Sequence, residues 1–455
     1  AAFAVPVAGE PSLFILEDST GSGTSQAALI LAHRILSAGA ADGFYFALPT
    51  MATADAMYTR TAEVYRRLFA EGERPSLVLA HSARDVSRGF RGSIGVEDPP
   101  PDRGYAEGEP GPATAVCSSW LADNRKKALL AHVGVGTIEK ALLAVLRARH
   151  QSLRLLGLQR KVLIVDEVHS CDEYQNRLLQ TLLAAHADLG GSAILLSATL
   201  SGAVRRALMA AYGPDAAGLP EDASWPYPGI LQARRHEPPR VDPVPAPAGS
   251  RRSFSLRLTA DLDEVLEPLI EASRTGCACW VRNTVADALE GFRLVAERVL
   301  FHARFALGDR LSIERGVLER FGPDSVGEQR VGWIVVATQV VEQSLDLDFD
   351  LLVSDLAPID LLIQRFGRGR RHPRDQQGNR VAGGDRRTPR PHVVLSPQPS
   401  SEAGPTWYSS FLPRASLVYR DHGRLWLTAR RLSEREGDAV SVPEDLRNLI
   451  ESVYA

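Results

Sequence analysis

The chain has 455 residues, which is too long for one ordinary hydrophobic core and predicts two or three domains. Its residues are 44% hydrophobic and 24% charged, a globular composition that excludes a disordered chain. The net charge of −3 excludes a basic field over the whole molecule, so nucleic-acid binding would have to come from local patches.

The first part of the chain alternates apolar, strand-like runs with helical patterns. Runs this apolar suit a parallel sheet covered on both faces, and the alternation predicts an α/β domain with right-handed crossovers. The predicted strands are 13–17, 43–48, 76–80, 161–165 and 192–196, and the predicted helices are 26–38, 50–70, 137–149 and 174–188. Residues 97–115 are rich in proline and glycine and predict a surface loop.

A glycine-rich turn, within EDSTGSGTSQAAL (17–29), separates the first predicted strand from the first predicted helix. The backbone N–H groups of such a turn and the helix N-terminus after it can hold a phosphate. Thr24 stands where a phosphate loop has lysine, whereas Ser25 keeps the hydroxyl that would ligate Mg²⁺. The pattern alone leaves a plain Gly-Ser turn open.

Two later strands end in residues that carry chemistry. KVLIVDEVHS (161–170) ends its strand in Asp166 and Glu167, at the edge where open α/β sheets bind ligands. An aspartate there can hold Mg²⁺, and the glutamate can polarise an attacking water. The strand at 192–196 is followed by Ser197 and Thr199, whose hydroxyls could relay the nucleotide state. The alternatives are an acidic turn and ordinary turn chemistry.

Residues 213–252 are proline-rich with little periodicity, and they predict an interdomain connector that runs over the surface. A second α/β block follows. Its predicted strands are 254–258, 277–281, 333–337, 351–354 and 391–395, and its predicted helices are 261–274, 284–298, 359–366 and 442–453. Residues 372–390 are rich in arginine, glycine and proline and predict a mobile segment.

Arginines crowd one helix end in IDLLIQRFGRGRRHPR (359–374). Arg368 and Arg371 are three apart and share a helix face, and arginine suits bidentate contact with phosphate. A solvated basic patch is the alternative, which Gln364 before the arginines disfavours. Upstream, Asp346 lies in a segment that follows the predicted strand at 333–337. By itself, this segment predicts only an acidic loop between two strands.

The cysteines and the apolar runs bear on location. Cys277 and Cys279 alternate in one apolar run, and no second pair at metal-ligand spacing follows, so we expect neither a zinc site nor a disulfide framework. Reduced thiols favour a cytoplasmic chain. No apolar stretch approaches the ~20 residues of a membrane span, and we expect no membrane partner.

Several long blocks resemble one family, in order and over residues 12–455. The motif order resembles a superfamily-two helicase, and the blocks resemble the CRISPR-associated helicase-nuclease of type I systems, most like the type I-E branch. The blocks are LPTMATADAMYTR (48–60), ALLAHVGVGTIEKALLAVL (128–146), VLIVDEVHSCDEY (162–174), CACWVRNTVADALE (277–290), LFHARFALGDR (300–310), DLLIQRFGRGRRHP (360–373) and YRDHGRLWLTARRL (419–432).

The resemblance implies an α/β fold of two tandem RecA-like domains with parallel sheets and a nucleotide cleft between them. The implied division is a first, ATP-binding RecA-like domain (1–212), the connector (213–252), a second RecA-like domain (253–412) and the start of a linker region (413–455). A guide-RNA surveillance complex of the Cascade type recruits members of this family to foreign DNA. They then move 3′ to 5′ on single-stranded DNA with ATP and cut it.

The resemblance also implies roles for residues of this chain. The ATP-binding residues would be Thr20, Gly21, Ser22, Gly23, Thr24, Ser25 and Asp346, with Ser25 and Asp166 holding Mg²⁺. The catalytic residues would be Asp166, Glu167, Gln364, Arg368 and Arg371, and the coupling residues Ser197 and Thr199. The DNA-tracking residues would be Pro49, Thr50, Gly136, Thr137, Arg282, Asn283, Thr338 and Gln339.

The chain departs from the family in three ways. The family's nuclease is an N-terminal domain with paired His-Asp metal ligands, and none of the 11 histidines here is followed by aspartate. We therefore expect the HD nuclease to be absent or to lie on another chain. The C-terminal domain that closes over the DNA is likewise expected to be missing. Thr24 replaces the loop lysine, and Asp18 puts a negative charge near the phosphates.

The effect of replacing the loop lysine on binding and on rate can be given a magnitude. A charge-assisted hydrogen bond contributes about 1.5–3 kcal/mol, and losing one donor to transition-state charge costs about 10²–10³ in rate. Nucleotide could still bind weakly, while turnover should be slow. Two functions stay open: an ATP-dependent DNA helicase or translocase with impaired ATPase, and a non-catalytic DNA-binding fragment or decayed homologue acting as a scaffold. A stand-alone nuclease is disfavoured.

Overall fold

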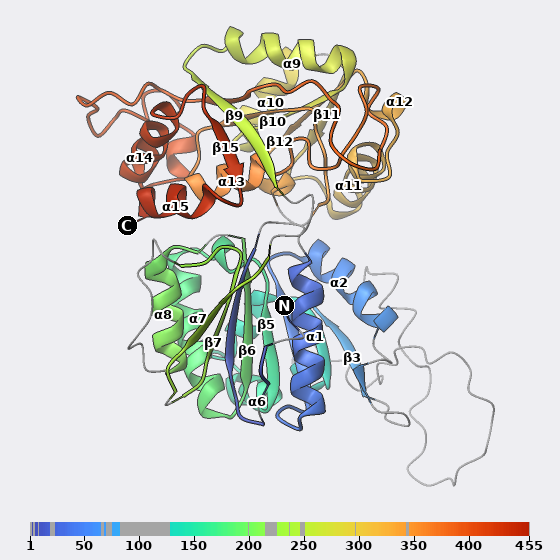
Figure 1. Cartoon of the computed structure of the whole chain (residues 1–455), viewed down its shortest axis with the longest axis vertical. Coiled ribbons are helices and arrows are strands. Elements are labelled where there is room, and N and C mark those ends of the chain that lie inside the picture. Colours follow the sequence, from blue (N-terminus) through green and yellow to red (C-terminus); the bar gives the residue numbers. More distant parts are fainter. Residues whose placement is uncertain are drawn as a thin grey trace, which may run out of the picture. The chain divides into compact units, whose positions relative to one another are not determined.

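The protein folds into two compact units, seen in a computed structural model (Figure 1). The first unit runs to Pro245, and the second holds the described residues after it. The structure describes residues 2, 5–7, 9–18, 23–64, 68–69, 75–81, 128–198, 200–213, 225–235, 237–245, 251–295, 297–342 and 345–454. In this part of the chain, no helix is long and apolar enough to cross a membrane.

The first unit is built on one sheet of eight strands in the order β3-β4-β2-β5-β6-β1-β7-β8. The strands from β3 to β1 are parallel, whereas β7 and β8 are antiparallel additions. The strands are β1 (Leu13–Glu17), β2 (Gly43–Leu48), β3 (Leu77–Ala80), β4 (Val133–Thr137), β5 (Lys161–Val165), β6 (Ser192–Ser197), β7 (Gly229–Ala233) and β8 (Arg240–Pro243). The helices are α1 (Thr24–Ser37), α2 (Met51–Val64), α5 (Ile138–Leu142), α6 (Gln151–Leu158), α7 (Glu173–Asp188) and α8 (Gly202–Tyr212).

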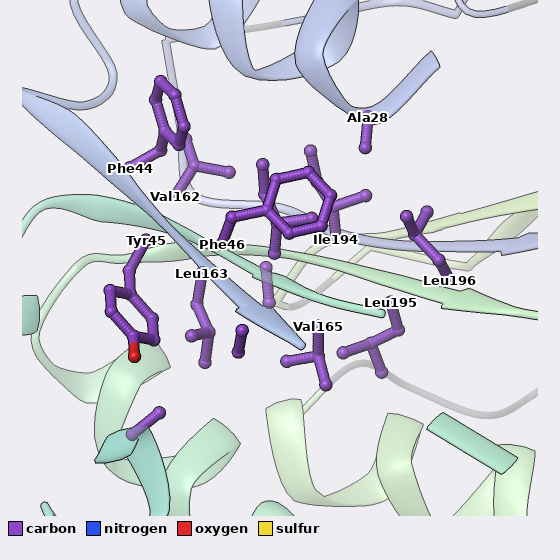
Figure 2. Close-up of a cluster of buried hydrophobic side chains, with 14 of the residues drawn as sticks. Ala28, Phe44, Tyr45, Phe46, Val162, Leu163, Val165, Ile194, Leu195 and Leu196 are labelled. Carbon is purple, nitrogen blue, oxygen red and sulfur yellow. The ribbon is translucent and has the colours of Figure 1, made fainter. Parts of the chain in front are cut away.

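The core of this unit covers both faces of the sheet, because its central strands are largely apolar and buried at every position. Figure 2 shows Phe46 and Ile194 on the face that carries Ala28 of α1, with Tyr45 and Leu195 on the opposite face. All five side chains are buried. Strands buried on both faces cannot shift register without losing apolar contacts, so the carboxyl ends of the strands stay aligned.

The second unit has a sheet of seven strands in the order β11-β12-β10-β13-β14-β9-β15, in which only β15 is antiparallel. The strands are β9 (Arg252–Thr259), β10 (Cys277–Val281), β11 (Arg298–Phe301), β12 (Trp333–Ala337), β13 (Leu351–Asp355), β14 (His392–Leu395) and β15 (Ala439–Val442). The helices are α9 (Asp263–Thr275), α10 (Val285–Leu294), α11 (Leu307–Phe321), α12 (Gly327–Arg330), α13 (Ile359–Phe366), α14 (His422–Ser433) and α15 (Leu446–Tyr454).

The segment 213–252, predicted as a surface connector, in part belongs to the first sheet. β7 pairs with β1 along its length, and Ile230 and Leu231 are buried. Pro228 precedes β7 and Pro243 ends the edge strand β8, positions where a missing N–H group costs little. The first unit therefore extends well beyond residue 212.

Residues 413–455, predicted as the start of a linker, contribute to the second unit. β15 pairs with β9, from Ala439 opposite Ser255 to Val442 opposite Arg252. α15 packs on α13 and α14. This end of the chain is therefore built into the second sheet and its helical layer.

The prediction of a mobile segment at 372–390 is wrong. Arg374 is fully buried, and its guanidinium donates to the carbonyl oxygens of Ser325 and Gly322 and to the carboxylate of Asp348. Arg387 reaches the same carboxylate. The arginines that made the segment look solvated are the groups that anchor it.

Candidate nucleotide-binding site

The carboxyl edge of the first sheet collects most of the predicted site residues of this unit. Glu17 at the end of β1 pairs in register with Ser197 at the end of β6. Ala47 of β2 pairs with Val165 of β5, and Leu48 pairs with Thr137 of β4. The predicted nucleotide residues follow β1, β6 and β5, and the predicted DNA residues follow β2 and β4, so the two sets share one edge side by side.

The N-terminus of α1 has a backbone that could hold a phosphate. Gly23 caps the helix with φ 94°, a left-handed conformation that favours glycine, and its carbonyl oxygen accepts the Ala27 N–H (3.0 Å). Thr24 and Ser25 begin α1, whose first turn has no acidic residue. Among the described residues no side chain caps this end of α1, where the positive end of the helix dipole lies. Thr20, Gly21 and Ser22 lie outside the described residues, as does Thr199.

The end of β5 holds Asp166 and Glu167 in a fixed arrangement. The Asp166 N–H donates to the carbonyl of Ala47 (2.9 Å), and Asp166 Oδ1 accepts the Glu167 N–H (3.0 Å). Glu167 has φ 53°, a left-handed conformation that costs energy for a residue with a side chain. Burial and the neighbouring charge of Glu167 raise the pKa of Asp166 to about 7.

His169 connects this strand end to the next one. Its Nε2 lies 3.0 Å from Glu167 Oε2, and its Nδ1 lies 2.9 Å from Ser197 Oγ. The Ala198 N–H points at the same Nδ1 (3.3 Å). Because a backbone N–H can only donate, Nδ1 is the acceptor and the ring hydrogen lies on Nε2, facing the Glu167 carboxylate. His169 was not among the predicted site residues, although it stands directly after Asp-Glu-Val.

These residues fit a magnesium ion and a phosphate chain. Asp166 supplies a carboxylate and Ser25 a hydroxyl, oxygen donors of the kind that Mg²⁺ prefers. A buried carboxylate with a raised pKa is also one that a cation would hold ionised. Mg²⁺, when bound, would neutralise charge on the phosphates, and Glu167 would orient and deprotonate a water.

A second buried link ties the end of β1 to the coupling segment. Glu17 accepts from Arg205 of α8 (2.8 Å) and from the Leu200 N–H (3.3 Å). Asp18 donates its N–H to the carbonyl of Ser197 (3.2 Å). The chain entering the phosphate turn is therefore joined to the chain leaving β6.

The residues of the first unit that are predicted to contact DNA also have structural roles. The Thr50 hydroxyl accepts the Thr53 N–H (3.2 Å) and so caps α2. A Cβ atom at Gly136 would lie 2.2 Å from the Ala80 carbonyl oxygen, so no other residue fits there. Thr137 is buried, and Pro49 precedes Thr50 in the loop after β2. Contact between these residues and DNA stays a prediction.

Arg282 and Asn283, predicted to contact DNA, have buried side chains that are bonded inside the second unit. The Arg282 guanidinium pairs with Asp355 (2.8 Å) and is 6% exposed. The Asn283 amide donates to the carbonyl of Leu356 (2.7 Å) and accepts from Arg365 (3.0 Å). Their burial favours a structural role for both side chains, at the carboxyl ends of β10 and β13.

Thr338 and Gln339 follow β12 at the same edge. Thr338 is buried, and its N–H donates to the carbonyl of Phe301 (3.1 Å). The Gln339 amide donates to the carbonyl of Asn283 (2.9 Å) and is half-buried. Of the four residues predicted to track DNA in this unit, Gln339 keeps the most exposure.

The arginine motif after α13 folds onto the segment that follows β12. Arg368 is 3% exposed and donates to the carbonyl oxygen of Glu342 (2.9 Å). Arg371 pairs with Asp346 (2.7 Å), which also contacts His372 (2.9 Å). Burial opposes ionisation of Asp346, but the hydrogen bond from His372 and the charge of Arg371 outweigh it and lower the pKa of this carboxyl group.

Gln364, a predicted catalytic residue of this unit, has an open hydrogen-bonding position. Its side chain is 6% exposed, and within the described part of the chain its Nε2 has no hydrogen-bond partner. Buried amide donors without a partner are rare in native proteins. This group is therefore suited to a ligand that completes it.

Comparison with known proteins gives the family. The family model described as "CRISPR-associated nuclease/helicase Cas3, C-terminal" matches residues 274–374. The CRISPR-associated endonuclease/helicase Cas3 of Escherichia coli K12 is 36% identical over 470 residues, which cover 99% of this chain and 49% of that protein. The chain belongs to the Cas3 family. It spans about half the length of the curated Cas3 relatives it matches.

Solved Cas3 structures share the fold. The T. fusca Cas3–AMPPNP crystal structure superposes with a TM-score of 0.81 at 33% identity, covering 98% of this chain and 50% of that one. A chain of a CRISPR RNA-guided surveillance complex in a pre-nicking state gives a TM-score of 0.72 at 30% identity, covering 98% of this chain and 49% of that one. The two sheets are therefore tandem RecA-like domains, as predicted, and they share the fold of the solved Cas3 structures.

Proposed function

We propose that the chain is the ATP-dependent, 3′-to-5′ single-stranded DNA helicase or translocase core of type I CRISPR interference, with turnover slowed by Thr24. The observation that carries this proposal is the bonded series Glu167, His169 and Ser197. It joins a water-activating carboxylate to the strand end from which the coupling segment leaves. A protein that only binds DNA has no need for such a connection.

The proposed chemistry assigns work to residues of both units. Gly23 and the N–H groups of α1 would bind the ATP phosphates, and Asp166 and Ser25 would hold Mg²⁺. Glu167 would take a proton from the attacking water, and His169 would hold its carboxylate in place. Arg371 would exchange the Asp346 carboxylate for a phosphate oxygen, and the open Gln364 amide would donate to the nucleotide.

The proposed partners follow the family. They are single-stranded DNA, a guide-RNA surveillance complex of the Cascade type and, if the HD nuclease lies elsewhere, a separate nuclease chain. The cofactors are ATP and Mg²⁺, and the proposed location is the cytoplasm. The similarity to a chain of a surveillance complex supports the second partner.

A non-catalytic DNA-binding scaffold is the alternative, and two observations favour it. Thr24 carries no positive charge to stabilise the phosphates, and Asp18 carries a negative charge that would repel them. A scaffold would keep the fold and the DNA surface while losing turnover.

A strand-displacement assay separates the two functions. The substrate is a duplex with a 3′ or a 5′ single-stranded overhang, incubated with Mg²⁺-ATP and the Thr24→Lys protein. We expect displacement with the 3′ overhang and little with the 5′ overhang, because the proposed motor moves 3′ to 5′. Binding of both substrates with displacement of neither would favour the scaffold.

A further inference from the structure

An aromatic pocket lies in the second unit, at the N-terminal end of α14 (labelled in Figure 1) and the loop before it. Its volume is about 390 Å³, within the range of pockets that bind small organic groups. Two tryptophans and a histidine provide its aromatic walls. The lining residues are Ser400, Ser401, Ala403, Gly404, Pro405, Trp407, His422, Gly423 and Trp426.

The polar atoms of these rings are already bonded to backbone. Trp407 Nε1 donates to the carbonyl of Gln398 (2.7 Å), and Trp426 Nε1 donates to the carbonyl of Ser400 (2.9 Å). His422 Nε2 lies 3.2 Å from the carbonyl oxygen of Ser416. These bonds fix the ring planes and occupy the indole donors. What the pocket offers to a ligand is therefore ring faces, which bind by stacking.

The surroundings of the pocket are basic, in contrast to the chain as a whole. Residues 398–434 contain five arginines and three carboxylates, whereas the whole chain carries a net charge of −3. Of these arginines, Arg414 pairs with Asp287 and Glu290, and Arg430 pairs with Glu434 (3.0 Å). The Arg430 guanidinium lies over the Trp426 ring, 5.3 Å from its centroid, and Arg420 is exposed. Stacking faces beside arginines are the combination with which proteins hold single strands.

We propose that this pocket binds a base of single-stranded DNA, stacked on Trp426 and Trp407, while the neighbouring arginines contact the phosphates. The inference rests on the proposed function, and it adds a site that contains none of the residues predicted to bind nucleotide or DNA. A proline-rich peptide is disfavoured, because its free carbonyl groups would need the indole N–H donors that Gln398 and Ser400 already occupy. Every base has a stacking face, so the pocket should accept any of them.

The test compares Trp426→Ala with the unchanged chain in binding to a fluorescent oligo-dT strand. Base–aromatic stacking predicts that the Kd rises about 5- to 100-fold. Trp426→Phe keeps a stacking face and should stay within about threefold of the unchanged chain. Tyr174→Ala removes an exposed aromatic ring of the first unit and serves as the control, with no change in Kd.

An abasic strand with the same number of phosphates makes the test specific to stacking. The proposal predicts that Trp426→Ala and the unchanged chain bind this strand equally, with the same salt dependence. An equal loss on both strands would overturn it, because the substitution would then act through the fold. No loss on oligo-dT would overturn it as well, as would a proline-rich peptide that binds the pocket without competing with DNA.

A second variant and the DNA binding of the unchanged chain separate failure of this inference from failure of the proposed function. Trp407→Ala is the second variant, and it should show the same difference between the two strands if Trp426→Ala fails to fold. If the unchanged chain does not bind single-stranded DNA, the proposed function fails together with this inference. If the unchanged chain binds and neither tryptophan matters, only this inference fails.

Discussion

Glu167 is held in the one unfavourable backbone conformation of the β5 strand end, and its carboxylate faces a neutral imidazole. A left-handed glutamate persists only where its surroundings fix it. Here the Asp166 carboxylate accepts a hydrogen bond from the Glu167 N–H, and His169 contacts the Glu167 carboxylate. The side chain is therefore positioned before any substrate arrives, which is what a general base requires.

Replacing Glu167 with glutamine tests this assignment. The Glu167→Gln amide oxygen can still accept the His169 hydrogen, so the fold and nucleotide binding should be preserved. It cannot take a proton, and we expect phosphate release in the Thr24→Lys background to fall about 10²- to 10⁴-fold. Glu173→Gln, an exposed carboxylate at the start of α7, is the matched control. Equal rates for the two variants would remove Glu167 from the chemistry.

Lys161 makes stability depend on pH. It starts β5 with its ammonium buried, donating to the carbonyl oxygens of Leu129 (2.5 Å) and Ala131, and burial lowers its pKa to about 7. Between about pH 7 and 10.5 the unfolded chain binds this proton more tightly than the folded chain does. Stability attributable to Lys161 therefore rises with pH in this window.

The size of that rise follows from linkage. The free energy of unfolding should increase by about 2 kcal/mol from pH 7 to pH 9 relative to a Lys161→Met variant. Urea unfolding of the two proteins at several pH values measures the difference, and the subtraction cancels the other titrating groups. Parallel pH profiles would mean that Lys161 stays protonated in the folded protein, with its pKa unshifted by burial.

The elements of the second unit are fastened by a buried cluster of opposite charges. Asp348 accepts from Arg374 and Arg387, and Arg330 lies 3.5 Å from it. Asp348 also accepts the Arg371 N–H (2.8 Å). The cluster thus joins α12, the segment after β12 and the arginine motif. Through the bond to the Arg371 N–H, it also fixes the position of the Arg371 backbone.

Breaking this cluster should cost much more than breaking a surface pair. Asp348→Asn leaves Arg374 buried without a full counter-charge, and we expect a loss of about 3–5 kcal/mol in the free energy of unfolding. Asp324→Asn breaks an exposed pair with Arg380 and should change it by less than about 0.5 kcal/mol. Urea denaturation compares them. Similar losses for both would show that the cluster does not bear on stability.

Sequence patterns predicted the strands whose runs were long, apolar and bounded by turns, such as β1, β5, β10 and β12. They missed β4, which Gly134 and Gly136 make look like a loop before a helix, and β11, which begins at the last residue of a predicted helix (284–298). β7 and β15 were missed because their pairing partners, β1 and β9, lie far away in the chain. Pairing between distant segments has no local pattern.

The site was predicted to a similar extent. The residues at strand ends could be found because each motif is continuous in the chain, as with Asp166 and Glu167. The partners that hold them could not, because Arg205 reaches Glu17 across 188 positions and Arg282 reaches Asp355 across 73. The role predicted for Arg282 was affected in the same way. An arginine in a motif is expected to be exposed, and only the structure shows that Arg282 is buried against Asp355.

At the scale of the whole molecule, the chain carries both RecA-like domains of the Cas3 family within about half the length of its relatives. Each unit contains one set of predicted nucleotide motifs and one set of predicted DNA motifs. A motor needs both sets to respond to one another. We therefore expect the proposed DNA-dependent turnover to require both units of the chain.

The most direct test is phosphate release from ATP, with and without single-stranded DNA, by this chain and by its Thr24→Lys variant. Thr24→Met supplies length without charge, and Thr24→Lys combined with Glu167→Gln excludes a contaminating ATPase. We predict slow release by the unchanged chain and release about 10²–10³ times faster by Thr24→Lys, stimulated by DNA. If Thr24→Lys is no faster, or DNA has no effect on either protein, the account of a motor limited by its phosphate loop is contradicted.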